Sequence, residues 1–352
     1  MEHQLIQKNN RQVAIWLFIG VAMIMVQVLL GGITRLTESG LSITEWKPIT
    51  GALPPLNEQA WQGAFDKYKL TDQFKYVHAG FSLHDFKFIF FWEWFHRLWA
   101  RWMGMVFLIG FVYFLFQKKF NQPMIRPMMV LFVLGALQGA IGWIMVQSGL
   151  VPEKYFVGHV ELATHFIAAM GLLAYTYWFA LKLLIPSSAP IFHRPLHRLL
   201  MQLLLLLILQ LSYGAFMAGL KAGQSAPTWP SINGYLIPPS ISELTPFYKN
   251  LLNNNITIQF IHRGLAYLIL IVTVIWWIKA ADIKNNKLFS AFKNAYLIII
   301  VLQVVLGVIT VLNAAKPTAL VWLGTLHQFT GMLTLVALVS LLYLIRRRPI
   351  AA

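Results

Sequence analysis

Cysteine is absent from this chain of 352 residues, so thiol chemistry, disulfide bonds and iron–sulfur ligation are excluded within it. Charge is scarce as well, because charged residues make up 11% of the chain and only 12 residues are acidic. Hydrophobic residues make up 58%, and the mean hydropathy is +0.64. This composition excludes a soluble domain of this size and predicts an integral membrane protein.

Apolar stretches long enough to cross a bilayer predict an all-α membrane protein with eight helices. The first stretch lacks a small-residue cleavage site, so we interpret it as a retained helix and not a removed signal peptide. The eight stretches lie at 13–34, 92–117, 127–147, 157–183, 197–219, 257–279, 289–313 and 319–345.

Sequence repeats divide these helices into two halves. At one common offset in residue number Gln27 matches Gln210 and Gly40 matches Gly223, and at a slightly smaller offset the pair Leu137-Gln138 matches Leu302-Gln303. We therefore expect two tandem four-helix bundles, residues 1–190 and 191–352. Because each half has an even number of helices, both enter the membrane in the same sense, which predicts a pseudo-two-fold axis along the membrane normal.

Four histidines repeat with the halves. The separation of His96 from His262 nearly equals that of His165 from His327, and both are close to the offset of the glutamine pairs. Two imidazoles on facing helices are what a six-coordinate haem iron needs, so each half is predicted to hold one haem. Zinc is the competing metal, but its sites usually recruit a carboxylate or thiolate, and the halves share no matched acid. The other six histidines fail the repeat register, and we assign none of them to metal.

Glu93 is an acid placed where haem chemistry could use it. It lies three residues before His96, on the same helix face, and the matching residue of the second half is Gln259, which cannot ionise. The alternative is a carboxylate paired with Arg97 or with Arg101 at the membrane interface.

Arginine follows the first histidine in both halves. A guanidinium at Arg97 or Arg263 is suited to pair with haem propionates. Snorkelling to lipid headgroups explains these two residues equally well.

Basic residues are distributed unevenly over the segments between the helices. Fifteen of the 28 lie in the two tails and in the segments around 118–126, 182–198 and 279–293, whereas ten of the 12 acidic residues lie on the opposite side. The positive-inside rule then places both termini in the cytoplasm. The net charge of +16 follows from this rule and from anionic lipids, and does not indicate nucleic-acid binding.

Three motifs resemble those of the haem A synthase family, in its cysteine-free proteobacterial and mitochondrial form. They are Gly32-Ile-Thr-Arg-Leu-Thr-Glu-Ser-Gly-Leu-Ser42, Phe86-Lys-Phe-Ile89 and Glu93-Trp-Phe-His-Arg-Leu-Trp-Ala-Arg101. The segments around the other three repeated histidines agree with this likeness, which extends over the eight-helix layout.

The resemblance implies an oxidoreductase that converts the C8 methyl group of haem O to a formyl group, giving haem A for terminal oxidases. It implies that His96 and His165 hold the substrate haem O, that His262 and His327 hold a resident haem b, and that Glu93 is the catalytic carboxylate. Two axial imidazoles leave no open position on iron, which favours water as the oxygen source. Haem O synthase, an unidentified electron acceptor, membrane lipid and a second copy of the chain are the expected partners.

Two other classes of protein would use the same four histidines. A di-haem electron-transfer protein would have no need of an acid beside one haem only, and a haem carrier would release its haem unchanged. The start of the chain is not rich in arginine, which favours a bacterial inner membrane over a mitochondrion.

Overall fold

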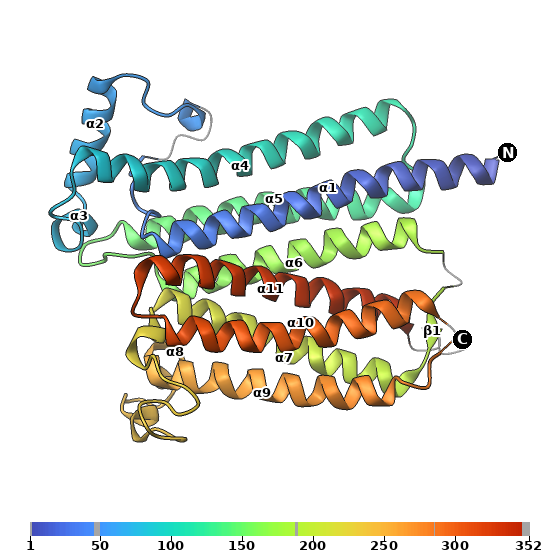
Figure 1. The fold of residues 1–352 in the computed structure, drawn as a ribbon. Helices are drawn as coiled ribbons and strands as arrows, with labels where there is room; N and C mark the ends of the chain where they lie inside the picture. The colour runs from blue at the N-terminus through green and yellow to red at the C-terminus, as the bar shows by residue number, and fades with distance from the viewer. Residues whose placement is uncertain (1, 46–49, 187–188, 285, 347–352) are drawn as a thin grey trace.

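Eight long helices run side by side in the computed structural model, which describes residues 2–45, 50–186, 189–284 and 286–346 (Figure 1). Each of them is long and apolar enough to cross a membrane, which confirms the all-α class and the count of eight spans among the described residues. They are α1 (Glu2–Leu36), α4 (Leu83–Phe116), α5 (Gln122–Gly149), α6 (His159–Leu184), α7 (Arg194–Gly219), α9 (Asn255–Lys279), α10 (Lys287–Leu312) and α11 (Pro317–Leu344).

Most helix ends lie within a few residues of the apolar stretches, and two helices begin much earlier. The first stretch was expected from residue 13, but α1 begins at Glu2, because a polar turn can continue a helix whose apolar part lies further on. The start of α4 is set by capping: Ser82 accepts a hydrogen bond from the amide of Asp85, whose carboxylate accepts one in return from the Ser82 amide.

Short helices gather at one end of the bundle, here called the loop end. The first half contributes η1 (Thr50–Ala52), α2 (Glu58–Lys69) and α3 (Asp72–Tyr76), and the second half contributes η2 (Ala222–Ser225), η3 (Pro239–Ser242) and α8 (Tyr248–Asn253). Stacked rings hold α2 against the start of α4, with the Phe65 and Phe86 centroids 5.1 Å apart. The chain termini lie at the opposite, terminal end, where β1 (Ile191–Phe192) pairs in parallel with β2 (Ile345–Arg346) (Figure 1).

Helices α1, α6, α7 and α11 connect the two halves. Helix α6 packs against α7 and α11, and α1 packs against α11 as well as against α4 and α6 of its own half. The proposed boundary at residue 190 lies in the connection between α6 and α7. The division into two bundles about a pseudo-two-fold axis stays a prediction.

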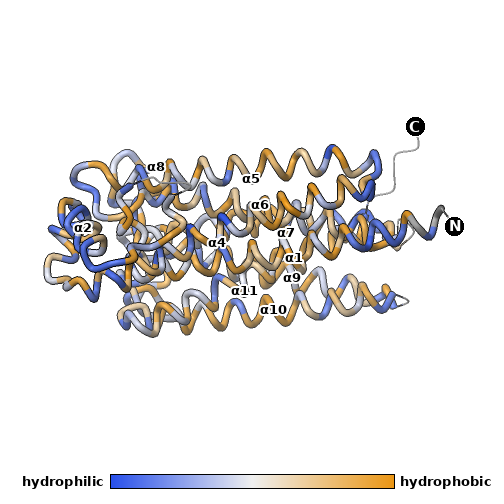
Figure 2. The backbone as a smooth tube through the Cα atoms, turned by 90° about the horizontal axis from the view of Figure 1, so that it is seen from above, coloured by the Kyte–Doolittle hydropathy of each residue, from blue (hydrophilic) through white to orange (hydrophobic). Residues whose placement is uncertain are grey.

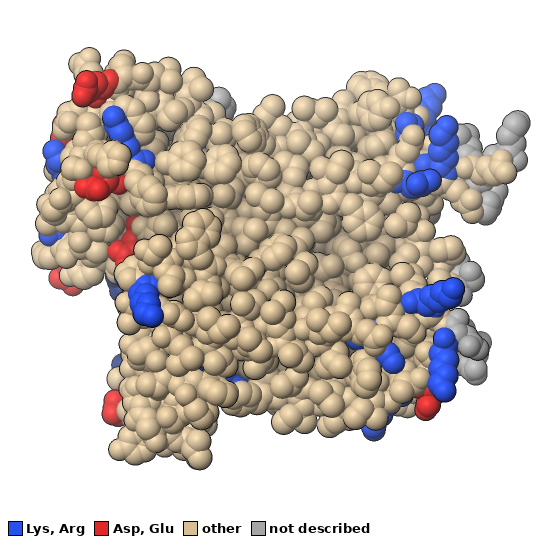
Figure 3. Space-filling model, viewed as in Figure 1, with Lys and Arg blue, Asp and Glu red and all other residues tan. Residues whose placement is uncertain are grey.

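Hydrophobic residues dominate the middle of the long helices, and hydrophilic residues gather at the two ends (Figure 2). On the face drawn in Figure 3, most acidic side chains lie at the loop end, together with several basic ones, whereas the charged side chains of the terminal end are mainly basic. This distribution agrees with the expected orientation, in which the more basic end is cytoplasmic. The orientation itself stays a prediction. Arg347 and Arg348, which were counted for the cytoplasmic side, lie outside the described residues.

Candidate haem sites

One cavity of 1130 Å³ inside the bundle is lined by all four repeated histidines, which come from α4, α6, α9 and α11. Each histidine lies in the half of its helix that is nearer the loop end. The fold thus brings together four side chains that are widely separated in sequence, from His96 in the first half to His327 near the end of the second.

Each histidine ring packs on a glycine of the preceding long helix. A methyl group built on Gly31 would lie 3.2 Å from Nε2 of His96, and one built on Gly142 would lie 2.7 Å from Cε1 of His165. In the second half, Gly214 and Gly307 stand in the same relation to the other two histidines, at 3.3 and 3.0 Å from Cε1 of His262 and His327. Glycine is needed at these positions because a side chain would fill the space that the imidazole occupies.

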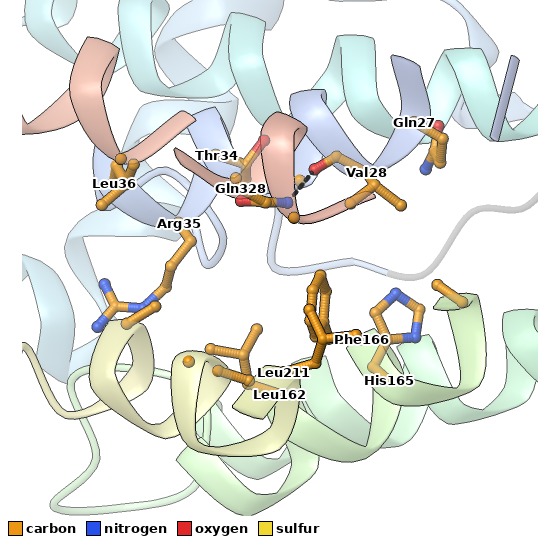
Figure 4. A pocket seen from close by; sticks show the side chains of 18 of the residues that line it. Gln27, Val28, Thr34, Arg35, Leu36, Leu162, His165, Phe166, Leu211 and Gln328 are labelled. Carbon is orange, nitrogen blue, oxygen red and sulfur yellow. Dashed lines mark hydrogen bonds between the residues drawn. The ribbon is translucent and has the colours of Figure 1, made fainter. Parts of the chain in front are cut away.

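A glutamine precedes each of these glycines by four residues, one helical turn away on the same face. Nε2 of Gln138 lies 3.2 Å from Nδ1 of His165. In the second half the amides of Gln210 and Gln303 each lie 3.4 Å from Nε2 of their histidine. The fourth, Gln27, lines the cavity across from His165, and its Oε1 is buried with no partner among the described residues (Figure 4).

The sequence itself contains this pattern. All four glutamines were used above, but only as markers of the repeat. The motif Gln-x-x-x-Gly occurs on each helix that precedes a repeated histidine helix. Four such occurrences were the available signal for histidine-positioning residues, at Gln27–Gly31, Gln138–Gly142, Gln210–Gly214 and Gln303–Gly307.

The second histidine pair has the spacing of two axial ligands. The ring centroids of His262 and His327 are 6.4 Å apart, and the rings are inclined at 77°. Two metal–nitrogen bonds of about 2 Å each, added to two ring radii, come to about 6 Å, so one metal ion fits between the rings. Nδ1 of each ring is buried without a partner in the described part of the chain, which leaves a nitrogen available on both. Across residues 2–346, apart from the undescribed gaps, no cluster of three or more His, Cys, Asp or Glu side chains forms a metal site.

Glu93 lies on the cavity wall, with 3% of its surface exposed. Its Oε1 accepts a hydrogen bond of 2.5 Å from Arg97, and its Oε2 accepts bonds of 2.6 Å from the Ser42 hydroxyl and 2.8 Å from the Ile43 amide. The interpretation of Glu93 as a partner of Arg97 is thereby confirmed. This ion pair leaves the carboxylate beside the cavity, where a role in catalysis stays a prediction.

The second half has the same arrangement of side chains, but a neutral glutamine takes the place of the carboxylate. Gln259 is fully buried, its Oε1 accepts a bond of 3.0 Å from Arg263, and its Nε2 donates to the Ala222 carbonyl. Arg263 also donates to three carbonyls of the segment that follows α7, those of Ala226, Thr228 and Ser231. Arg97 and Arg263 both line the cavity, and each donates its hydrogen bonds to groups of its own half of the chain. Their predicted contact with haem propionates remains a prediction.

Two histidines outside the repeat register have structural partners. His78 is bonded to the Tyr68 hydroxyl at 2.6 Å and to Glu38 at 3.3 Å. His193 caps α7 by accepting a bond from the amide of Leu196.

Comparison with known proteins identifies the family. Residues 14–339 match the model of the COX15-CtaA family, described as cytochrome oxidase assembly protein. The chain belongs to this family. Membership confirms the resemblance seen in the motifs, and the heme A synthase relatives described next indicate a haem-modifying membrane oxidoreductase.

The relatives extend over nearly the whole chain. A heme A synthase from Nitrosospira multiformis is 39% identical over 342 residues, which cover 96% of this chain and 95% of the relative. One from Bradyrhizobium sp. (strain ORS 278) is 41% identical and covers 93% and 90%. One from Flavobacterium psychrophilum is 40% identical and covers 93% and 96%.

Proposed function

We propose that the chain converts haem O to haem A, with haem O held between His96 and His165 and haem b between His262 and His327. The observation that carries this division is the replacement of Glu93 by Gln259 at the matching site. Both halves keep the histidines, the glycines behind them and the arginine. Because an ionisable group lies beside the first histidine pair and not beside the second, the chemistry is assigned to the first pair.

The overall reaction at the substrate removes four electrons and four protons from one methyl group and one water molecule, and leaves a formyl group. Glu93 is suited to stabilise positive charge that develops at the methyl carbon, because a fixed carboxylate in an apolar cavity acts strongly on a nearby charge. Transfer of a proton to Glu93 would break a hydrogen bond, since Ser42, Ile43 and Arg97 already donate to it. The geometry therefore favours electrostatic stabilisation over proton transfer.

Haem b, when bound, supplies a one-electron carrier. The residues that would hold it are His262 and His327, whose spacing and free nitrogens fit a bis-histidine iron. Gly214 and Gly307 fix how closely each ring approaches the neighbouring helix, and Gln210 and Gln303 orient the rings. Because both histidine pairs line one cavity, electrons can pass between the sites without crossing a thick protein layer.

We further propose that the chain crosses a bacterial inner membrane with both termini in the cytoplasm. The gathering of acidic side chains at the loop end, with mainly basic ones at the terminal end, supports this orientation (Figure 3). Haem O synthase is the expected source of the substrate, and homo-oligomers and a separate electron acceptor belong to the same proposal.

Mass-resolved haem analysis tests the function. The chain is expressed with a haem O synthase, and the wild type is compared with Glu93→Gln, which installs the residue of the second half, and with the matched change Gln259→Glu. We expect haem A in the wild type and in Gln259→Glu. In Glu93→Gln we expect haem O or a hydroxylated intermediate, with haem still bound.

Two results would contradict the proposal. Unmodified haem in all three proteins would favour an electron-transfer protein or a haem carrier. Normal haem A output from Glu93→Gln would remove Glu93 from the mechanism.

A further inference from the structure

The two halves differ in the size of the residues beside their histidines. In the first half the cavity is lined by Gly104 of α4 and by Gly135 and Gly139 of α5. At the matching positions, aligned by the same repeat offsets as the histidines and glutamines, the second half has Leu270, Ile300 and Val304.

The glycines of the first half face open space. A methyl group built on any of the three would meet no atom within 4 Å, and all three residues are exposed. In the second half the same positions are filled, because Ile300 is 3% exposed and Leu270 packs against the hydrophobic core. The first half thus lacks three aliphatic side chains that the second half has at the matching positions, and two of these, Ile300 and Val304, line the same cavity.

The long helices also pack differently in the two halves. Helix α9 packs against its neighbour α10. Helices α4 and α5 meet through rings nearer the terminal end, where Phe132 lies 4.7 Å from Phe107 and 4.9 Å from Phe111, centroid to centroid. Between these rings and His96 lies the part of the cavity that the three glycines border. Leu108 and Trp143 also line the cavity and are exposed at the helix surface.

We propose that the groove between α4 and α5, bordered by Gly104, Gly135 and Gly139 and closed at one end by Phe107 and Phe132, binds the isoprenoid tail of haem O. The inference rests on the proposed placement of haem O at the first histidine pair. Haem O differs from haem b by a long hydroxyethylfarnesyl chain, so only the substrate half needs an apolar channel beside its porphyrin. The glycines on α4 and α5 have no side chains and so leave room for such a chain. Burial of each of its methylene groups favours binding.

The same groove accounts for discrimination between the two haems. On this proposal haem O is disfavoured in the second half, where Ile300 and Val304 line the cavity at positions that are glycine in the first half. Haem b at the first half would leave the groove without its apolar occupant. The glycines therefore act as specificity-determining residues, and the histidines serve both sites alike.

The test measures haem affinity independently of turnover. Protein that carries its resident haem, purified from cells without haem O synthase, is titrated with haem O and, separately, with haem B, and binding at the open site is followed by difference spectra. The variants Gly135→Ile and Gly139→Val install the residues of the second half, and Val304→Gly is the matched control. The spectrum of the resident haem reports that each variant is folded.

We expect Gly139→Val and Gly135→Ile to weaken haem O binding by about tenfold or more, since 1.4 kcal/mol corresponds to a factor of ten. Haem B affinity should change by less than about twofold on the same scale, and Val304→Gly should leave the affinity of the open site for haem O unchanged. Equal losses for both haems, or no loss for haem O, would overturn the groove assignment.

A further variant separates this proposal from the one on which it rests. If His165→Ala still binds haem O as the wild type does, the placement of haem O at the first pair is wrong, and the groove proposal fails with it. If His165→Ala abolishes binding and Gly139→Val leaves it intact, only the groove proposal fails.

Discussion

Glu38 and Lys221 occupy matching positions in the two halves, at the offset that also relates Gln27 to Gln210, and form an ion pair with each other. Both have left-handed backbone conformations, with φ of 58° and 53°, just beyond the ends of α1 and α7. A duplicated position has thus acquired opposite charges. The contact joins the halves at the loop end, and the Lys221 ammonium lies 4.2 Å from the ring centre of Phe156.

Removal of this ion pair should weaken the contact between the halves. We expect Lys221→Gln to lower the free energy of unfolding by about 1 kcal/mol, a modest value because exposed pairs are screened; the two side chains are 31% and 26% exposed. Thermal unfolding in detergent measures the effect, and Lys249→Gln, which replaces an exposed lysine of α8 in the second half, is the control. Equal melting temperatures for the two variants would contradict the prediction.

Stability should depend on the protonation of Glu38. The hydrogen bond from His78, followed by that from Lys221, lowers the pKa of Glu38 to about 2. Because this pKa is depressed relative to about 4.3 in an unfolded chain, the stabilisation is complete above that value and is lost as the pH falls toward 2. Unfolding curves between pH 5 and about 2 should show this loss in the wild type. If Glu38→Gln shows the same slope, other carboxylates are responsible.

The four glycines behind the histidines should not tolerate a methyl group. Gly142→Ala would bring its Cβ to 2.7 Å from His165, and Gly307→Ala would bring its Cβ to 3.0 Å from His327, so one ring or helix has to move. We expect Gly307→Ala to lose resident haem and Gly142→Ala to lose substrate binding.

Gly264→Ala is the matched control for these variants. Its added methyl group meets nothing within 4 Å, and in a helix interior alanine is favoured over glycine by about 1 kcal/mol. Haem content per protein, measured from the absorption spectrum, distinguishes the variants. Full haem content in Gly307→Ala would show that the ring adapts.

Gln303 should tune the resident haem through His327. Replacement by Leu removes the amide that lies 3.4 Å from the ring. Loss of such a partner typically weakens metal binding by about 10-fold to 100-fold. We expect Gln303→Leu to shift the midpoint potential and electron paramagnetic resonance spectrum of the resident haem, whereas Gln138→Leu should leave both unchanged. Identical spectra for the wild type and Gln303→Leu would remove Gln303 from the site.

The long helices and the repeated histidines could be predicted from the sequence, because hydrophobic stretches and internal repeats indicate them directly. The eight helices follow from the apolar stretches, and the repeat singled out the four histidines that line the cavity. That both pairs share one cavity was not predicted. The short helices α2 and α3 were not predicted, because their stability depends on contacts of Phe65 and Tyr68 with a distant helix. Tertiary contacts of this kind leave no periodic signal in a short segment.

The partners of the predicted site residues were harder to foresee. Pairing of Glu93 with Arg97 was one of two alternatives, and only the fold shows that Ser42 and Ile43 also bind this carboxylate. These two residues are distant from Glu93 in sequence, and no local spacing rule connects them to it. The glycines at 104, 135 and 139 carried no individual signal until the structure showed that they border one space.

The recurrence of Gln-x-x-x-Gly before each repeated histidine has a consequence for the history of the chain. Helix α1 supplies the glycine and α4 the histidine, and α5 with α6, α7 with α9 and α10 with α11 repeat that division. The smallest recurring unit is thus a two-helix hairpin that carries one glycine and one histidine, and each proposed haem site lies where two hairpins face each other. An ancestral hairpin could have formed such a pocket as a homodimer, before any fusion. In the present chain the four hairpins are not equivalent, because the acid and the three glycines that face open space occur in the first half only.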